Sequence, residues 1–171
     1  MPKLLSTVLS LILVISPIWP LGDNPSIGDP LIIVNLAYNE LAFIKDGEIK
    51  QVHQVASGQI TNATPLGQFT IIVKAKDPYY RKLNIEGGAE NNPLGTRWIG
   101  FDAKDTDGRT YGIHGTNHPE QIGQYITAGC VRLPNEVIEE LYEFIPLGTQ
   151  ILITEEDLSF EELAKTLGAI E

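Results

Sequence analysis

The stretch YGIHGTNHPEQIGQYITAGCVRL, residues 111–133, holds the single cysteine of a 171-residue chain, Cys130. Two of the three histidines, His114 and His118, lie in the same stretch. A cysteine reacts as its thiolate, and with an ordinary pKa of about 8.5 only a few per cent is ionised at neutral pH. A histidine within hydrogen-bond reach takes the thiol proton, so this stretch predicts a nucleophilic cysteine with a histidine partner.

The surroundings of both residues favour such a pair. His114 ends a strand-forming run, Arg109 to His114, and an apolar run follows Cys130. Two neighbouring strands carrying these residues would bring the thiol and the imidazole together. We expect the N–H groups around Ala128 to Cys130 to offer an oxyanion hole, with Gly129 leaving room for a substrate backbone.

Most of the remaining chain predicts short strands. Six runs are rich in β-branched, aromatic and aliphatic residues, with turn residues between them: 31–36, 40–45, 49–57, 68–74, 97–101 and 109–114. Asp46-Gly47, between the second and third runs, is a strong signal for a tight hairpin. This spacing favours a mostly β sandwich or barrel over alternating strands and helices.

Two helices are predicted near the C-terminal end. The segment 135–145 places apolar side chains on one face, with Asn135 as its cap. A further strand is expected over 149–154. Ser159 and Glu162 form a capping box that starts the second helix.

Length and charge exclude several classes of protein. A chain of 171 residues with 43% hydrophobic and 20% charged residues is typical of one folded domain. Its formal net charge is -10, without a dense basic run, whereas binding a phosphate backbone needs clustered lysine and arginine. Nucleic acid is therefore not an expected partner.

The first residues indicate export. Lys3 precedes an uncharged apolar run, Leu4 to Ile18, which is short for a membrane span. We interpret residues 1–22 as a signal peptide or as a retained N-terminal membrane anchor, and 23–30 as a linker. The expected location is the cell envelope, in the periplasm or cell wall. A lone cysteine in an exported chain pairs between chains, is buried, or reacts.

Several motifs together resemble a known family. They are IHGT (113–116), IG (122–123) and TAGCVRL (127–133) followed by Asn135. These residues resemble the active-site signature of the L,D-transpeptidase catalytic domain, of the YkuD type. TPLGQF (64–69) and NPLGTRWIGF (92–101) resemble upstream segments of the same family. The resemblance covers about residues 31–154, in the family's order.

The resemblance implies a β-rich enzyme that remodels bacterial peptidoglycan without a metal or organic cofactor. The family's cysteine attacks the carbonyl of the third, L-configured stem residue and expels the terminal D-amino acid. An amine of a neighbouring stem then resolves the thioester. Carried over, Cys130 is the nucleophile, His114 is the general base, and the Gly115 carbonyl orients the imidazole. The residues that the resemblance places at the substrate are Arg132, Thr127, Gly129 and Ala128.

The resemblance also sets an expected organisation. The catalytic domain would occupy residues 31–154 and a C-terminal helical tail residues 155–171. We expect a monomer whose partners are peptidoglycan stem peptides. One position departs from the family pattern, because Ala128 stands where a histidine commonly precedes the Gly-Cys pair. Since the base maps to His114, we expect activity to survive this replacement.

Other interpretations stay open. If water resolves the thioester, the protein is an L,D-carboxypeptidase, and the Ala128 departure also allows a non-catalytic wall-binding module. His114, His118 and Cys130 are potential zinc ligands, although the glycine and proline between them predict a loop. Arg132 has the alternative role of a structural ion pair, and Thr127 that of a loop support by hydrogen bonds.

Overall fold

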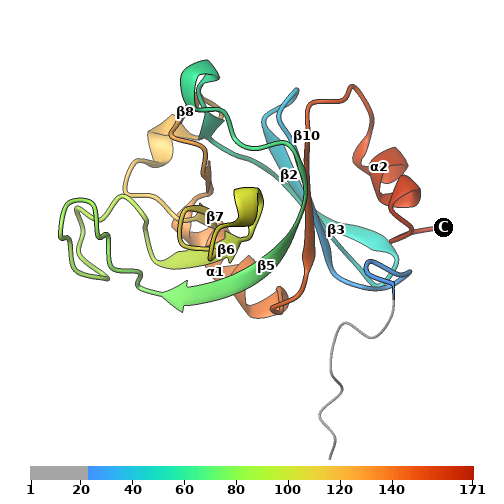
Figure 1. Ribbon diagram of the computed structural model, residues 1–171, viewed down its shortest axis with the longest axis horizontal. Helices are drawn as coiled ribbons and strands as arrows, with labels where there is room; N and C mark the ends of the chain where they lie inside the picture. The colour runs from blue at the N-terminus through green and yellow to red at the C-terminus, as the bar shows by residue number, and fades with distance from the viewer. Residues whose placement is uncertain (1–22) are drawn as a thin grey trace, which may run out of the picture.

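The computed structural model describes residues 23–171, which fold around one large curled sheet of eight strands (Figure 1). The interpretation of residues 1–22 as a signal peptide or anchor lies outside this range. Within 23–171, no helix combines the length and the apolar character that crossing a membrane requires. The fold is mostly β, which confirms the class that the sequence predicts.

The elements follow the predicted runs closely. The strands are β1 Leu31–Asn35, β2 Glu40–Lys45, β3 Glu48–Gln54, β4 Ser57–Gly58, β5 Gly67–Lys76, β6 Arg97–Phe101, β7 Tyr111–His114, β8 Tyr125–Thr127, β9 Val131–Arg132 and β10 Gln150–Thr154. The two α-helices are α1 Asn135–Phe144 and α2 Phe160–Thr166. Three 3-10 turns lie at Ile60–Asn62, Ala103–Asp105 and Pro119–Gln121.

Local signals set the tightest connections. Asp46 and Gly47 both have positive φ, 54° and 75°, as the predicted two-residue hairpin between β2 and β3 requires. At the start of α2, the Ser159 side chain accepts from the Glu162 N–H while the Glu162 carboxylate accepts from the Ser159 N–H. Both hydrogen bonds of the predicted capping box are therefore present, which confirms it. Each joins residues only three positions apart in the sequence.

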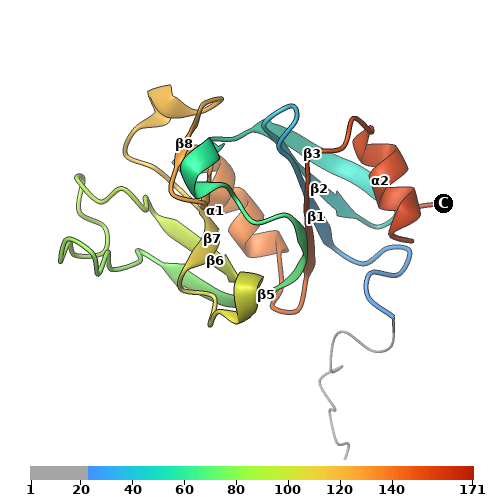
Figure 2. The same ribbon diagram turned by 45° about the horizontal axis from the view of Figure 1, so that its top comes forward.

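Eight strands form one sheet in the order β3-β2-β1-β10-β5-β6-β7-β9. Neighbours are antiparallel except for β1 with β10 and β7 with β9, which run parallel. The long strand β5 sweeps across the molecule and curls the sheet into a half-barrel (Figures 1 and 2). The curl separates one end, formed by β6, β7 and β9, from the other end, which carries α2.

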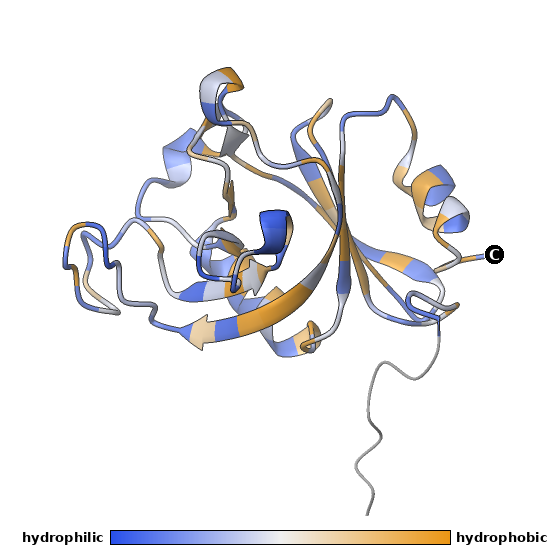
Figure 3. Cartoon of the chain, in the orientation of Figure 1, coloured by the Kyte–Doolittle hydropathy of each residue, from blue (hydrophilic) through white to orange (hydrophobic). Residues whose placement is uncertain are grey.

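Both faces of the central strands are covered. Side chains of β1 alternate between two clusters, so Ile32 and Val34 enter the first and Leu31 and Ile33 the second. The first cluster includes Ile138 and Leu141 of α1, and the second includes Leu163 and Ala164 of α2. Figure 3 colours the chain by hydropathy and shows hydrophobic residues along the central strands. Burial on both sides explains why this strand is an unbroken apolar run.

A lysine of the sheet holds the end of helix α1. The Lys74 ammonium donates to the carbonyls of Tyr142 and Ile145, the latter at 2.7 Å, and it lies 4.2 Å from the centre of the Tyr142 ring. These carbonyls belong to the last turn of the helix, where no intrahelical donor is available and a cation is favoured. The ammonium therefore ties α1 to β5, and α1 in turn packs on β6 and β7.

We predict that Lys74→Met lowers the free energy of unfolding by about 2 kcal/mol, because it removes charged donors from two carbonyls at the helix end. Urea unfolding measures the change. Lys165→Met on α2 is the matched control, since that lysine makes only an exposed ion pair with Glu161 and should cost about 0.5 kcal/mol or less. Equal urea midpoints for the two variants would contradict the assigned role of Lys74.

Candidate active site

Cys130 directly precedes a short strand, β9, that lies beside the strand of His114. Strands β7 and β9 pair in parallel, with Ile113 opposite Val131 and His114 opposite Arg132. The cysteine directly precedes this pairing, and its thiol donates a hydrogen bond to the Thr110 carbonyl at 3.5 Å. The predicted neighbouring strands are thus present, and they bring the two sequence-distant segments to one edge of the sheet.

Burial controls the protonation of the thiol. The residue is half-buried, and desolvation raises the pKa of the Cys130 thiol. The Gly112 backbone and the positive charge of Arg132 act in the opposite direction, with smaller effects. The net direction is upward, so the resting thiol is protonated at neutral pH.

His114 is a buried, neutral imidazole. Its side chain is 3% exposed and stacks on the Trp98 indole, with ring centres 5.5 Å apart. Burial lowers the pKa of His114 to about 4; the Gly115 and Leu94 carbonyls favour the protonated form, while the charge of Arg132 disfavours it. At neutral pH, Nδ1–H donates to the Gly115 carbonyl at 2.6 Å. This bond assigns the lone pair to Nε2, the form that a general base needs.

The resting site therefore contains a neutral pair instead of an ion pair. Among the interactions of residues 23–171, no hydrogen bond joins the Cys130 thiol to the imidazole, because the thiol donates to Thr110. Catalytic hydrogen bonds in unliganded enzymes are often long and tighten when substrate binds. The arrangement places an unprotonated base at the end of β7 and a protonated thiol directly before the adjacent strand β9.

Arg132 stands beside both groups, and its charge influences the pKa of each. Its Nη1 donates to the Gln121 side chain at 2.8 Å. No ion pair found between residues 23 and 171 includes Arg132, so the geometry gives no support to its alternative role in a structural ion pair.

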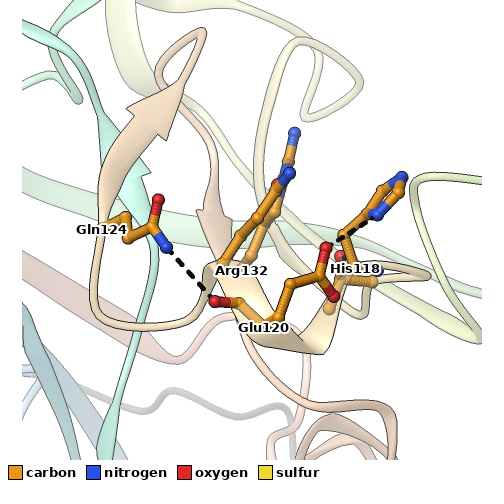
Figure 4. Close-up of polar contacts among 6 residues, drawn as sticks. His118, Glu120, Gln124 and Arg132 are labelled. Carbon is orange, nitrogen blue, oxygen red and sulfur yellow. Dashed lines mark hydrogen bonds and ion pairs between the residues drawn. The ribbon is translucent and has the colours of Figure 1, made fainter.

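His118 lies apart from the pair. Its Nδ1 hydrogen-bonds the Glu120 carboxylate at 3.0 Å on the exposed loop shown in Figure 4, where the Gln124 amide donates to the Glu120 carbonyl. In the part of the chain that the structure covers, no three histidine, cysteine or acidic side chains gather closely enough to share a metal ion. The geometry therefore gives no support to a zinc site built from both histidines and the cysteine.

The segment before the cysteine is held by its own hydrogen bonds. The Thr127 hydroxyl donates to the Cys130 carbonyl at 2.6 Å and accepts from the Gly129 N–H at 3.1 Å. Because the Gly129 N–H already donates to Thr127, only the N–H groups of Ala128 and Cys130 are left for the predicted oxyanion hole. Gly129 has φ of 114°, a conformation that disfavours any side chain, while Ala128 is exposed.

Asn135 has a role that the sequence did not predict. It is the first residue of α1 instead of its cap, and its Oδ1 accepts from the N–H groups of Thr116 at 3.0 Å and Thr96 at 3.3 Å. A Cβ on Gly115 would lie 2.1 Å from this oxygen, and one on Gly95 2.2 Å away. The asparagine thus fastens the backbone after His114 to the segment that leads into β6.

A pocket of about 450 Å³ opens at the thiol. Trp98 forms part of the pocket wall. In the antiparallel pairing of β6 with β7, Trp98 is the register partner of His114, and pairing the two predicted strands could have indicated this contact. A long loop, residues 77–95, forms another wall. Only the end of this loop, NPLG (92–95), belongs to a segment that resembles the family; residues 77–91 carry no motif that marks them as part of a site.

Comparison with known proteins agrees with this geometry. A model of the L,D-transpeptidase catalytic domain, YkuD, matches residues 29–153. The chain belongs to the L,D-transpeptidase catalytic domain family. It is 56% identical over 155 residues to a protein of Bacillus subtilis provisionally named L,D-transpeptidase YqjB, covering 91% of this chain and 88% of that protein. YkuD of the same species is 31% identical over 134 residues, covering 75% of this chain and 71% of that protein.

Solved L,D-transpeptidase structures share the fold. The NMR structure of the catalytic domain from an Enterococcus faecium L,D-transpeptidase has a TM-score of 0.58 and 26% identity, covering 74% of this chain and 98% of that domain. A longer crystal structure of an Enterococcus faecium L,D-transpeptidase mutant has a TM-score of 0.60 and 24% identity. The match covers 74% of this chain and half of that longer one.

We predict that Asn135→Ala lowers the free energy of unfolding by about 2 kcal/mol, because it leaves two backbone N–H groups without an acceptor. Urea unfolding measures the loss. Asn135→Asp keeps the accepting oxygen and should recover most of the stability. If the alanine variant unfolds at the wild-type urea concentration, the assigned clamp is wrong.

Alkylation by iodoacetamide tests the neutral pair. Because burial raises the pKa of the thiol, we expect the rate constant for Cys130 to rise about tenfold per pH unit from pH 6 to pH 8. The same single-cysteine chain unfolded in urea is the matched control and should react faster at pH 7. A folded-state rate that exceeds the control and stays constant over this range would instead show a thiolate–imidazolium pair.

Proposed function

We propose that the protein is a peptidoglycan L,D-transpeptidase that forms an acyl-enzyme on Cys130. The observation that carries the proposal is the parallel pairing of β7 with β9, which brings the segment of Cys130, a residue that lines the pocket, beside the strand that ends in the buried His114. Membership of the family supports the same activity. The export predicted for residues 1–22 would deliver the enzyme to its substrate in the cell envelope.

The first half-reaction would begin when Nε2 of His114 takes the thiol proton. The sulfur then attacks the carbonyl carbon of the third, L-configured residue of a donor stem, and the amide bond to the terminal D-amino acid breaks. The imidazolium returns its proton to the departing amine. The products are a thioester on Cys130 and a free D-amino acid.

The second half-reaction uses the same groups. An amine of a neighbouring stem attacks the thioester carbonyl, the carbon–sulfur bond breaks, and a new amide cross-links the two stems. The amine's proton passes to His114 and then to the leaving sulfur, which restores the neutral pair. If water replaces the amine, the product is a trimmed stem instead, so the fate of the thioester separates transpeptidase from carboxypeptidase.

The neighbouring groups have assignable roles in both steps. The Gly115 carbonyl holds Nδ1–H and thereby keeps the lone pair on Nε2. The charge of Arg132 would stabilise the developing thiolate and the tetrahedral oxyanion, because no ion pair within residues 23–171 engages its guanidinium. Burial of His114 makes the imidazolium costly, which favours rapid transfer of its proton to the leaving group.

Acylation by a carbapenem tests the proposal. We expect intact wild-type protein to gain the mass of one carbapenem molecule and Cys130→Ser to gain none, because a hydroxyl is far less ionised than a thiol. His114→Ala should slow the adduct by about 100-fold or more through loss of the base. His118→Ala is the matched control and should acylate at the wild-type rate, since its imidazole faces Glu120.

Two outcomes would contradict these assignments. Reversed effects of the two histidine variants would show that the wrong base is named. A wild-type chain that takes no adduct but still binds stem peptide would favour the wall-binding module. Product analysis with a tetrapeptide stem and an amine acceptor then decides the fate of the thioester, with a cross-linked dimer expected and a tripeptide alone indicating a carboxypeptidase.

A further inference from the structure

The pocket at the thiol carries a charge opposite to that of the whole chain. The chain has 22 acidic and 12 basic residues, yet the pocket lining contains three cations and no carboxylate. Arg81 and Lys82 come from the loop 77–95, and Arg109 comes from the segment that enters β7. A cationic pocket in an acidic protein attracts anions selectively.

These cations are available to a ligand. No ion pair recorded for the described part of the chain includes Arg81 or Lys82. Arg109 pairs with Asp107 at 2.8 Å, but both side chains are more than half exposed, so water screens the pair and a ligand can compete for the guanidinium.

Internal hydrogen bonds fix the backbone of the loop 77–95, which carries Arg81 and Lys82. Asn92 is 1% exposed, and its amide donates to the carbonyls of Pro78 at 2.8 Å and Glu86 at 3.1 Å, while its Oδ1 accepts from the Leu94 N–H at 2.9 Å. Backbone hydrogen bonds also join Tyr80 and Ile85 in both directions, at 2.9 and 3.1 Å.

This loop projects from the ends of β5 and β6 at the left of Figures 1 and 2, on the opposite side of the molecule from α2. Its hydrogen bonds hold the Arg81–Lys82 turn in place before any ligand arrives. Such preorganisation reduces the entropy lost on binding. Long loops without regular structure in compact domains are usually functional.

The lining also selects the shape of the ligand. Most of the remaining lining is apolar or aromatic, with Val73, Ala75 and Trp98 among its residues. The carbon chain of a ligand can pack against such walls while its carboxylate pairs with the cations of the same pocket. The pocket therefore fits an aliphatic segment that ends in a carboxylate and is attached to the residue under attack at the thiol.

We propose that Arg81, Lys82 and Arg109 form a carboxylate-recognition site that selects donor stems with a free carboxylate next to the scissile bond. This proposal rests on the proposed function and names the substrate that the same site prefers. Two groups of a stem supply this chemistry: a side-chain carboxylate of the third residue, and the terminal carboxylate of the leaving D-amino acid. Conversion of the recognised carboxylate to an amide removes the charge-assisted hydrogen bonds.

Binding, measured by titration calorimetry on full-length Cys130→Ser, tests the site independently of turnover. Three synthetic tetrapeptide stems are compared: one with both carboxylates free, one with the third-residue side chain amidated, and one with the terminal carboxylate amidated. We expect one amidated stem to bind about tenfold more weakly, as expected when a partly exposed charged contact is lost. The stem that loses affinity identifies the carboxylate.

The cation variants complete the test. Arg81→Gln with Lys82→Gln should weaken binding of the free stem about tenfold and leave the weak amidated stem unchanged, and Arg109→Gln should act in the same direction. Lys165→Gln, which removes one positive charge from α2, is the matched control and should change neither affinity. Equal affinity for all three stems, or equal weakening of every stem by the double variant, would overturn the proposal.

Failure of the proposed function has a different signature. A chain that binds stems with this carboxylate preference but whose wild type forms no acyl-enzyme keeps the recognition site and loses the transpeptidase assignment. Iodoacetamide, which is uncharged, reports whether the thiol of the cation variants remains reactive in the wild-type Cys130 background. Wild-type alkylation rates there show that weaker stem binding comes from lost recognition and not from a disrupted nucleophile.

Discussion

The parallel pairing of β7 with β9 is the constraint on which the site depends. It is short, joining only Ile113 with Val131 and His114 with Arg132, and each paired residue lies eighteen positions from its partner in sequence. Neither strand is long enough to be stable alone, so the pairing relies on α1, which packs on β6 and β7, and on the Asn135 side chain, which holds the backbone after the histidine. Lys74 supports the same pairing indirectly, because its hydrogen bonds to the last carbonyls of α1 hold that helix on the sheet.

Burial gives this pairing its chemical consequence. The imidazole is held between the Trp98 ring and the Gly115 carbonyl, where desolvation keeps it neutral and its tautomer is fixed. Desolvation also raises the pKa of the cysteine, which keeps its thiol protonated at neutral pH. In the proposed mechanism, the thiol proton passes to His114 when substrate occupies the pocket. A protected thiol suits an enzyme whose location, by prediction, is outside the reducing cytoplasm.

Local sequence patterns predicted much of this fold but less of its site. Asp46-Gly47 and the Ser159–Glu162 box act over two to four residues, so their outcomes could be predicted from the sequence. The cysteine–histidine pair was predicted from the chemistry of a lone cysteine near two histidines and, separately, from the motif resemblance. No local pattern predicted β8, which is three residues long, and β9, which is two residues long, was expected only from the argument that pairs the cysteine with the histidine. The contacts of Asn135 were not predicted either, because they also join residues that are distant in the sequence. Its side chain suits a helix cap, but it accepts hydrogen bonds from two separate segments instead. No sequence pattern distinguishes Arg81 and Lys82 from other surface cations. Their place at the pocket is known only from the folded structure.

The protonation state of His114 joins all of these features, and nitrogen NMR of the histidine side chains observes it directly. With ¹⁵N-labelled protein and His114→Gln to assign the signals, the account predicts a neutral imidazole protonated on Nδ1 from pH 5.5 to pH 8, with titration only near pH 4. Chemical shifts of an imidazolium at pH 7, lost when Cys130 is replaced by serine, would show a standing thiolate–imidazolium pair and contradict it.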